Sequence, residues 1–135
     1  MTVQVVLDAS AALDLLIPTE RGERIAGFLL GVEADLQVPP HFRIECTHAL
    51  RSMLLRGVVG EDRAAACHQD LLDLRCTVWS DGVLLDRTWG LRHSMTAYEA
   101  AYLALAEILE ATLVTSDRRF ARAAHALGRA PITVF

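Results

Sequence analysis

Hydrophobic residues in this chain form short β-rich runs, separated by longer stretches of helical composition. The first run, Val3–Leu7, has Gln4 as its only polar residue, which is typical of a strand buried inside a sheet. Similar short runs predict further strands, and Pro and Gly mark the ends of the segments between them. The expected strands are 3–7, 36–38, 76–79, 112–115 and 132–134, and the expected helices are 9–16, 20–30, 42–56, 61–74, 86–93, 97–109 and 118–127.

Strands that alternate with helices predict an α/β fold, a parallel five-stranded sheet with helices on both faces. The chain has 135 residues, enough for one hydrophobic core, and it contains no repeat and no linker. We therefore expect one domain over residues 1–135.

Composition indicates a folded protein, since 53% of the residues are hydrophobic and 22% are charged. No apolar run approaches the roughly 18 residues of a membrane span, and the N-terminus does not resemble a signal peptide. We expect a cytoplasmic protein with no membrane partner.

Missing residue types exclude several chemistries. All 13 basic residues are arginine, so a P-loop, a Schiff-base enzyme and a lysine-dependent phosphatase are excluded. Cys46, Cys67 and Cys76 form no C-x-x-C pair and are expected to be free thiols. A net charge of −4 disfavours nucleic-acid binding, but cations bound to an acidic site would offset it.

Acidic residues fall where a parallel sheet places its ligands. Asp8 directly follows the first predicted strand, and Asp117 follows the fourth. The carboxyl ends of parallel strands share one edge of the sheet, and Glu45 and Glu99 lie in helices that can reach the same edge. Clustered carboxylates repel each other unless they are protonated or neutralised, and Mg²⁺ or Mn²⁺ is the usual neutraliser of an all-oxygen cluster.

Each acid also has a purely structural interpretation. Asp8 and Asp117 stand where helix N-caps belong, and Thr96 with Glu99 spells a T-x-x-E capping box. Glu45 suits an exposed helix surface. These interpretations remain open at the level of sequence.

Other residues that could form a metal site or act as a nucleophile lack the partners that these roles require. His41, Glu45 and His48 share a helix face that could bind a transition metal, but no further ligand follows at a familiar spacing. Ser10 lacks a placed base that would make it a nucleophile. The larger aromatic residues are expected to pack inside the protein; they are Trp79, Trp89, Tyr98 and Tyr102.

Four separated segments together resemble a known family. They are VVLDASAAL, PPHFRIE, TAYEAAYLALAE and LVTSDRRFA, and they occur in the order and at the spacing of a PIN domain. More narrowly, the whole chain resembles the VapC toxins of VapBC toxin–antitoxin systems. The resemblance implies one PIN domain over residues 1–135 with strand order 3-2-1-4-5, which makes the first and fourth strands neighbours.

The resemblance also implies the site. It assigns Glu45 a catalytic role beside three acids that are both catalytic and metal-binding, and it adds two supporting hydroxyls. Two arginines that open the helix beside Asp117 are placed to contact RNA phosphates, with simple solvation as the open alternative. Glu99 departs from the family pattern, which has the shorter Asp at this position. The metal-binding acids are Asp8, Glu99 and Asp117, the supporting residues are Ser10 and Ser116, and the RNA-binding residues are Arg118 and Arg119.

The activity that the resemblance implies is Mg²⁺- or Mn²⁺-dependent endoribonuclease action of a toxin on structured RNA such as tRNA or rRNA. A small VapB-type antitoxin would neutralise it, and a homodimer would assemble further with that antitoxin. Two alternatives remain: a PIN nuclease of RNA maturation or decay without an antitoxin, and a catalytically inactive PIN-like binding module.

Overall fold

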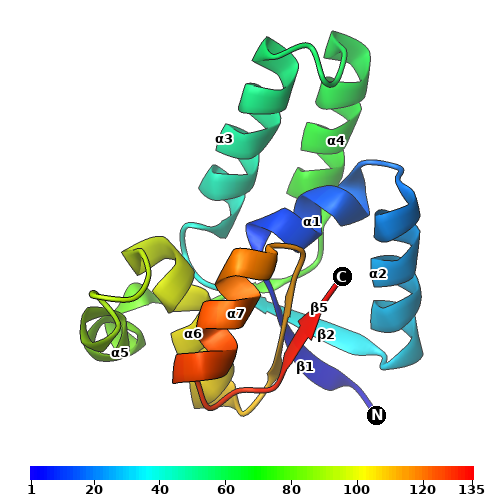
Figure 1. The fold of residues 1–135 in the computed structure, drawn as a ribbon. Coiled ribbons are helices and arrows are strands. Elements are labelled where there is room, and N and C mark those ends of the chain that lie inside the picture. Colours follow the sequence, from blue (N-terminus) through cyan, green and yellow to red (C-terminus); the bar gives the residue numbers. More distant parts are fainter.

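The computed structural model describes residues 1–135 and contains a parallel sheet of five strands (Figure 1). The strand order is β3-β2-β1-β4-β5, which confirms the predicted order 3-2-1-4-5. All four neighbouring pairs run parallel. The strands are β1 (Val3–Leu7), β2 (Ala34–Val38), β3 (Thr77–Val78), β4 (Thr112–Thr115) and β5 (Ile132–Val134).

The helices agree with the expected segments, with small shifts at their ends. The largest difference precedes the fifth helix, where a 3₁₀ turn, η1 (Asp81–Val83), was not predicted and the helix itself is shorter. The helices are α1 (Ala9–Leu16), α2 (Glu20–Gly31), α3 (Phe42–Leu55), α4 (Glu61–Asp73), α5 (Leu85–Gly90), α6 (Ala97–Leu109) and α7 (Arg118–Leu127).

The core lies around the two central strands. Val5, Val6 and Leu7 of β1 are almost wholly buried, as the apolar run predicts, although Val3 at the start of the strand is exposed. Helix α6 packs against β1 and β4 and buries every residue from 100 to 106. The edge strand β3 is exposed and only two residues long, which protects the sheet from pairing with other chains.

Helices cover the sheet from two sides. Figure 1 shows α2 on one side of the strands and α6 and α7 on the other, while α3 and α4 form a hairpin that projects away from the sheet. Opposite faces are expected because right-handed connections leave β1 and β4 in opposite directions across the sheet. The order of the strands along the sheet therefore reverses between β1 and β4, and their carboxyl ends flank the crevice in which ligands bind in such sheets.

Glu107 of α6 connects α5 and the end of α7 to the core, through an ion pair with Arg87 of α5 and a hydrogen bond from Arg129 just after α7. The Glu107 carboxylate accepts hydrogen bonds from the Arg87 guanidinium at 2.8 and 3.2 Å and from the Arg129 backbone N–H at 2.9 Å. Burial raises the pKa of Glu107, but these bonds outweigh burial and the net pKa is lowered. The helix that begins beside Asp117 is thereby tied to the core at its other end.

The cysteines are all free, as expected. Cys46 and Cys67 are buried and Cys76 is half-buried. Burial, together with the charges of Glu45 and Asp8, raises the pKa of the Cys46 thiol to about 12, so this sulfur stays protonated and serves as packing.

No helix in the structure combines the length and the apolar character that crossing a membrane requires.

Candidate active site

A pocket of about 230 Å³ opens at the switch point and contains carboxylates from four separate segments. Asp8 comes from the end of β1, Asp117 from the end of β4, Glu45 from the first turn of α3 and Glu99 from the first turn of α6. The fold therefore brings the four predicted acids to one place. The remaining lining residues are Ala9, Ser10, Leu13, Ala49, Tyr102 and Phe120.

Asp8 is the most enclosed of the four acids, with 5% of its surface exposed. The Thr115 hydroxyl donates to its Oδ2 at 2.6 Å, and the Ser10 hydroxyl donates to its Oδ1 at 2.7 Å. The Ala11 backbone N–H donates to the same Oδ1 at 3.0 Å, so Asp8 also caps α1. These three donors fix the carboxylate at the junction of β1, α1 and β4.

Burial raises the pKa of Asp8 to about 6. Hydrogen bonds from Thr115, Ala11 and Ser10 act in the opposite direction, and the charge of Glu45 adds to the increase. A carboxylate that is charged at neutral pH in spite of burial strongly favours a nearby cation.

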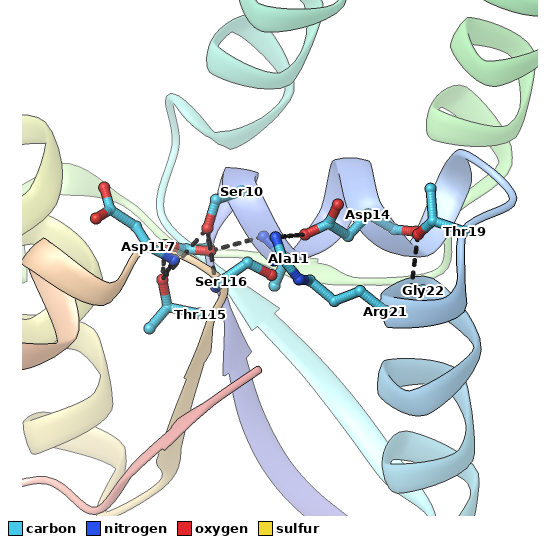
Figure 2. Close-up of polar contacts among 10 residues, drawn as sticks. Ser10, Ala11, Asp14, Thr19, Arg21, Gly22, Thr115, Ser116 and Asp117 are labelled. Atoms are coloured by element: carbon cyan, nitrogen blue, oxygen red, sulfur yellow. Dashed lines mark hydrogen bonds and ion pairs between the residues drawn. The ribbon is translucent and has the colours of Figure 1, made fainter.

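Thr115, the last residue of β4, and Ser116 directly after it complete the support of Asp8. Figure 2 shows Ser10, Thr115 and Ser116 close together at the ends of the strands. The Ser10 oxygen accepts from the Ser116 backbone N–H at 3.0 Å, and the Thr115 oxygen accepts from the Asp117 N–H at 3.0 Å. The Ser116 Oγ is buried and has no hydrogen-bond partner.

Thr115 is a site residue that sequence reasoning missed. It is completely buried and bonds to both Asp8 and Asp117. The available signal was its place as the last residue of β4, directly across from the end of β1 in a parallel pair.

One carboxylate oxygen of Asp117 caps α7, and the other makes no hydrogen bond. Its Oδ1 accepts from the Phe120 N–H at 3.0 Å, which confirms the predicted N-cap of α7. Its Oδ2 has no partner, and in Figure 2 the Asp117 carboxylate points away from Thr115. An N-cap needs only one oxygen, so capping leaves the other oxygen available to the pocket.

Glu99 is turned back toward the start of α6. Its Oε1 accepts from the Thr96 backbone N–H at 3.2 Å, and the Thr96 hydroxyl accepts from the Glu99 N–H at 3.1 Å. This confirms the predicted capping box. Its Oε2 pairs with the exposed guanidinium of Arg119 at 3.1 Å, so one of the two predicted RNA-binding arginines is bound to one of the predicted acids. Arg118 is exposed.

Glu45 is held by a second residue that sequence reasoning missed. The Tyr102 hydroxyl donates to Glu45 Oε1 at 2.8 Å. Burial, together with the charge of Glu45, raises the pKa of Tyr102 far above its usual value, so the phenol remains a donor. The alternative interpretation of Glu45 as exposed helix surface is wrong, because its side chain lines the pocket and is half-buried.

A neighbouring hollow of about 380 Å³ shares Glu45 with this pocket. His41 and His48 line it together with Tyr98, and His41 stacks edge-on against both Tyr98 and Tyr102. The expected aromatic packing is found for Tyr102 and for the half-buried Trp79, but it is wrong for Tyr98 and Trp89, which are 63% and 69% exposed.

No three His, Cys, Asp or Glu side chains are arranged in the structure to hold an ion. Glu99 is turned to Thr96 and Arg119, so its carboxylate does not complete such a group.

The family model of the PIN domain matches residues 5–126. The chain belongs to the PIN-domain family. Among the relatives of this PIN domain, Ribonuclease VapC12 of Mycobacterium tuberculosis is 33% identical over 118 residues, which cover 87% of this chain and 90% of the relative. This similarity places the chain in the VapC group. The PIN-domain match over residues 5–126 contains all four acids of the pocket.

Solved structures of other proteins share the fold. PAE2754 from Pyrobaculum aerophilum superposes with a TM-score of 0.71 at 23% identity, covering 96% of this chain and 83% of the other. VapBC2 from Rickettsia felis, bound to a DNA fragment from its promoter, gives a TM-score of 0.66 at 12% identity and covers 98% of both chains. At these identities the likeness concerns the architecture alone.

We expect Asp8→Asn to stabilise the protein in EDTA above pH 6. The raised folded-state pKa means that Asp8 favours the folded state below its ordinary value of 3.8 and that this contribution is lost as the pH rises through about 6. Asn can still cap α1 but cannot ionise. The free energy of unfolding of the variant should therefore exceed that of the wild type by on the order of 2 kcal/mol at pH 8, and by less toward pH 5. Urea unfolding at the two pH values measures this, and an advantage independent of pH would contradict it.

Proposed function

We propose that this protein is a Mg²⁺- or Mn²⁺-dependent endoribonuclease of the toxin type. The observation that carries the proposal is the convergence of Asp8, Glu45, Glu99 and Asp117 on one pocket in a chain of the VapC group. The name of the relative VapC12, a ribonuclease, supports RNA as the substrate class. Structured RNA such as tRNA or rRNA is the substrate we expect.

The donors in the pocket fit a hard divalent cation. All four charged groups are carboxylates, Asp117 Oδ2 has no partner, and the unpartnered Ser116 Oγ is a buried polar atom that suits a water bound in the site. We assign Asp8, Glu99 and Asp117 to hold the cation, with Glu45 beside them. A bound cation of this kind polarises a phosphodiester and lowers the pKa of water.

The chain's own residues orient the reacting groups. Ser10 and Thr115 hold the Asp8 carboxylate in a single orientation, and the α7 cap holds Asp117. The exposed Arg118 and Arg119 at the start of α7 supply positive charge beside the pocket for phosphate groups of the RNA. A phosphate that binds Arg119 competes with Glu99 for the guanidinium.

One observation favours a second candidate, a catalytically inactive PIN-like binding module. Glu99 is engaged in its capping box and in the ion pair with Arg119, and both contacts draw its charge away from the other acids. Metal-dependent RNA cleavage would distinguish the proposed nuclease from this inactive module. Toxicity on expression would distinguish it from the other alternative, a PIN nuclease without an antitoxin.

The partner we propose is a small VapB-type antitoxin. The R. felis neighbour is a VapBC complex, in which a toxin chain of this fold occurs together with VapB. We further propose a homodimer that assembles with the antitoxin in the cytoplasm.

Asp117→Asn tests the nuclease. We expect the purified protein to cleave RNA in Mg²⁺ or Mn²⁺ and to lose cleavage in EDTA, and we expect the variant to lose at least about 100-fold. Asn is as good an N-cap as Asp, so the melting temperature should stay near native. Asp62→Asn on the exposed surface of α4 is the matched control and should cleave normally. Full activity in EDTA would overturn the metal mechanism.

Glu99→Gln separates capping from catalysis. Gln can complete the capping box but carries no charge for a cation, so we expect stability within about 0.5 kcal/mol of wild type and loss of most cleavage. Glu99→Asp, which restores the family residue, should retain much of the activity. If Glu99→Gln cleaves normally while Glu99→Ala loses about 1 kcal/mol of stability, Glu99 serves only the helix start.

Expression in a bacterial host tests the toxin. We expect the wild-type protein to slow growth, Asp8→Asn to be harmless, and a small protein encoded beside this one to restore growth when co-expressed. New RNA 5′ ends mapped after induction would identify the cleaved RNA. Equal growth inhibition by the wild type and Asp8→Asn would contradict a toxic nuclease.

A further inference from the structure

The Tyr102 hydroxyl is an unusual group for its position. Tyr102 lies in the middle of α6, 2% exposed, in a helix whose neighbouring core residues are otherwise Ala and Leu. A Phe ring would fill the same space without adding a polar atom. The hydroxyl has one partner in the structure, Glu45 Oε1 at 2.8 Å.

This hydrogen bond joins two elements that supply different parts of the pocket. Glu45 comes from the first turn of α3, and Tyr102 comes from α6, 57 residues later in the chain. His41, just before α3, packs edge-on against the Tyr102 ring at 5.2 Å between ring centroids, so the ring is held from the α3 side as well. Tyr102 therefore connects the start of α3 to the core helix.

The bond also determines which oxygen of Glu45 is free. Glu45 has three rotatable side-chain torsions and makes no other side-chain hydrogen bond in the structure. With Oε1 occupied by the phenol, Oε2 is the oxygen left for the pocket. Such partners of metal-binding carboxylates commonly change metal affinity or activity by 10–100-fold when they are removed.

We propose that Tyr102 is a positioning residue, whose hydroxyl holds Glu45 so that one carboxylate oxygen serves the divalent cation site. The proposal rests on the proposed function. It adds a residue that acts only through Glu45 and touches neither the cation nor the RNA.

Tyr102→Phe removes the hydroxyl and keeps the ring. We expect the Kd for Mn²⁺, measured by electron paramagnetic resonance on the full chain, to rise about tenfold, and the Mg²⁺ concentration for half-maximal RNA cleavage to rise in parallel. Tyr98→Phe is the matched control, because it makes the same chemical change one turn earlier at a side chain that is 63% exposed. It should leave both values unchanged.

A double-mutant cycle with Glu45→Gln tests whether Tyr102 acts through Glu45. If it does, adding Tyr102→Phe to Glu45→Gln causes no further loss of Mn²⁺ affinity. An unchanged Kd in Tyr102→Phe, or full additivity in the double variant, would overturn the proposal. If the wild type itself binds no Mn²⁺ and cleaves no RNA, the proposed function fails instead.

A second measurement does not depend on the fold of Tyr102→Phe. The chain has two tyrosines, so Tyr98→Phe leaves Tyr102 as the only one. In that protein, labelled with ¹³C at the tyrosine Cζ, Mg²⁺ should shift the phenol resonance, because the cation shares the Glu45 charge that the hydroxyl faces. A resonance that saturating Mg²⁺ leaves in place would count against the positioning role.

Discussion

The hydrogen bond from the Thr115 hydroxyl to Asp8 joins the ends of two central strands that lie 107 residues apart in the chain. Asp8 is buried, and burying a carboxylate costs free energy unless it is hydrogen-bonded, paired or protonated. Hydroxyls from Ser10 and Thr115 satisfy its oxygens without neutralising its charge. The site thus retains an unneutralised negative charge at the point where strand order reverses, and the rest of the pocket is arranged around it.

The four acids differ in how they are restrained. Asp8 and Asp117 are fixed by backbone caps and neighbouring hydroxyls at strand ends, so their positions follow from the sheet itself. Glu45 and Glu99 approach from helices, and other residues hold their carboxylates: Tyr102 holds Glu45, and Thr96 and Arg119 hold Glu99. The two glutamates therefore depend on contacts outside the sheet.

The Glu99–Arg119 ion pair joins an acid that we propose to bind the cation to an arginine that we propose to bind RNA. The same guanidinium that neutralises Glu99 is exposed at the start of α7, where RNA phosphates would arrive. An exposed ion pair of this kind has a small net free energy, so exchanging one anionic partner for another costs little. Under the proposed function, a phosphate that binds Arg119 would replace Glu99 in this ion pair, while the capping box with Thr96 would still hold Glu99 Oε1. The Glu99 side chain is long enough to complete the capping box with Thr96.

The order of strands and helices was predictable from the sequence, because hydrophobic runs such as Val3–Leu7 and the helical segment Ala97–Leu109 carry their own periodicity. Asp8 and Asp117 were predictable for the same reason, since they directly follow strands that meet at one edge. The bond between Tyr102 and Glu45, the role of Thr115 and the orientation of Glu99 toward Arg119 required the tertiary structure. Local pattern determines where a side chain leaves the backbone, whereas its hydrogen-bond partner depends on which distant elements pack beside it.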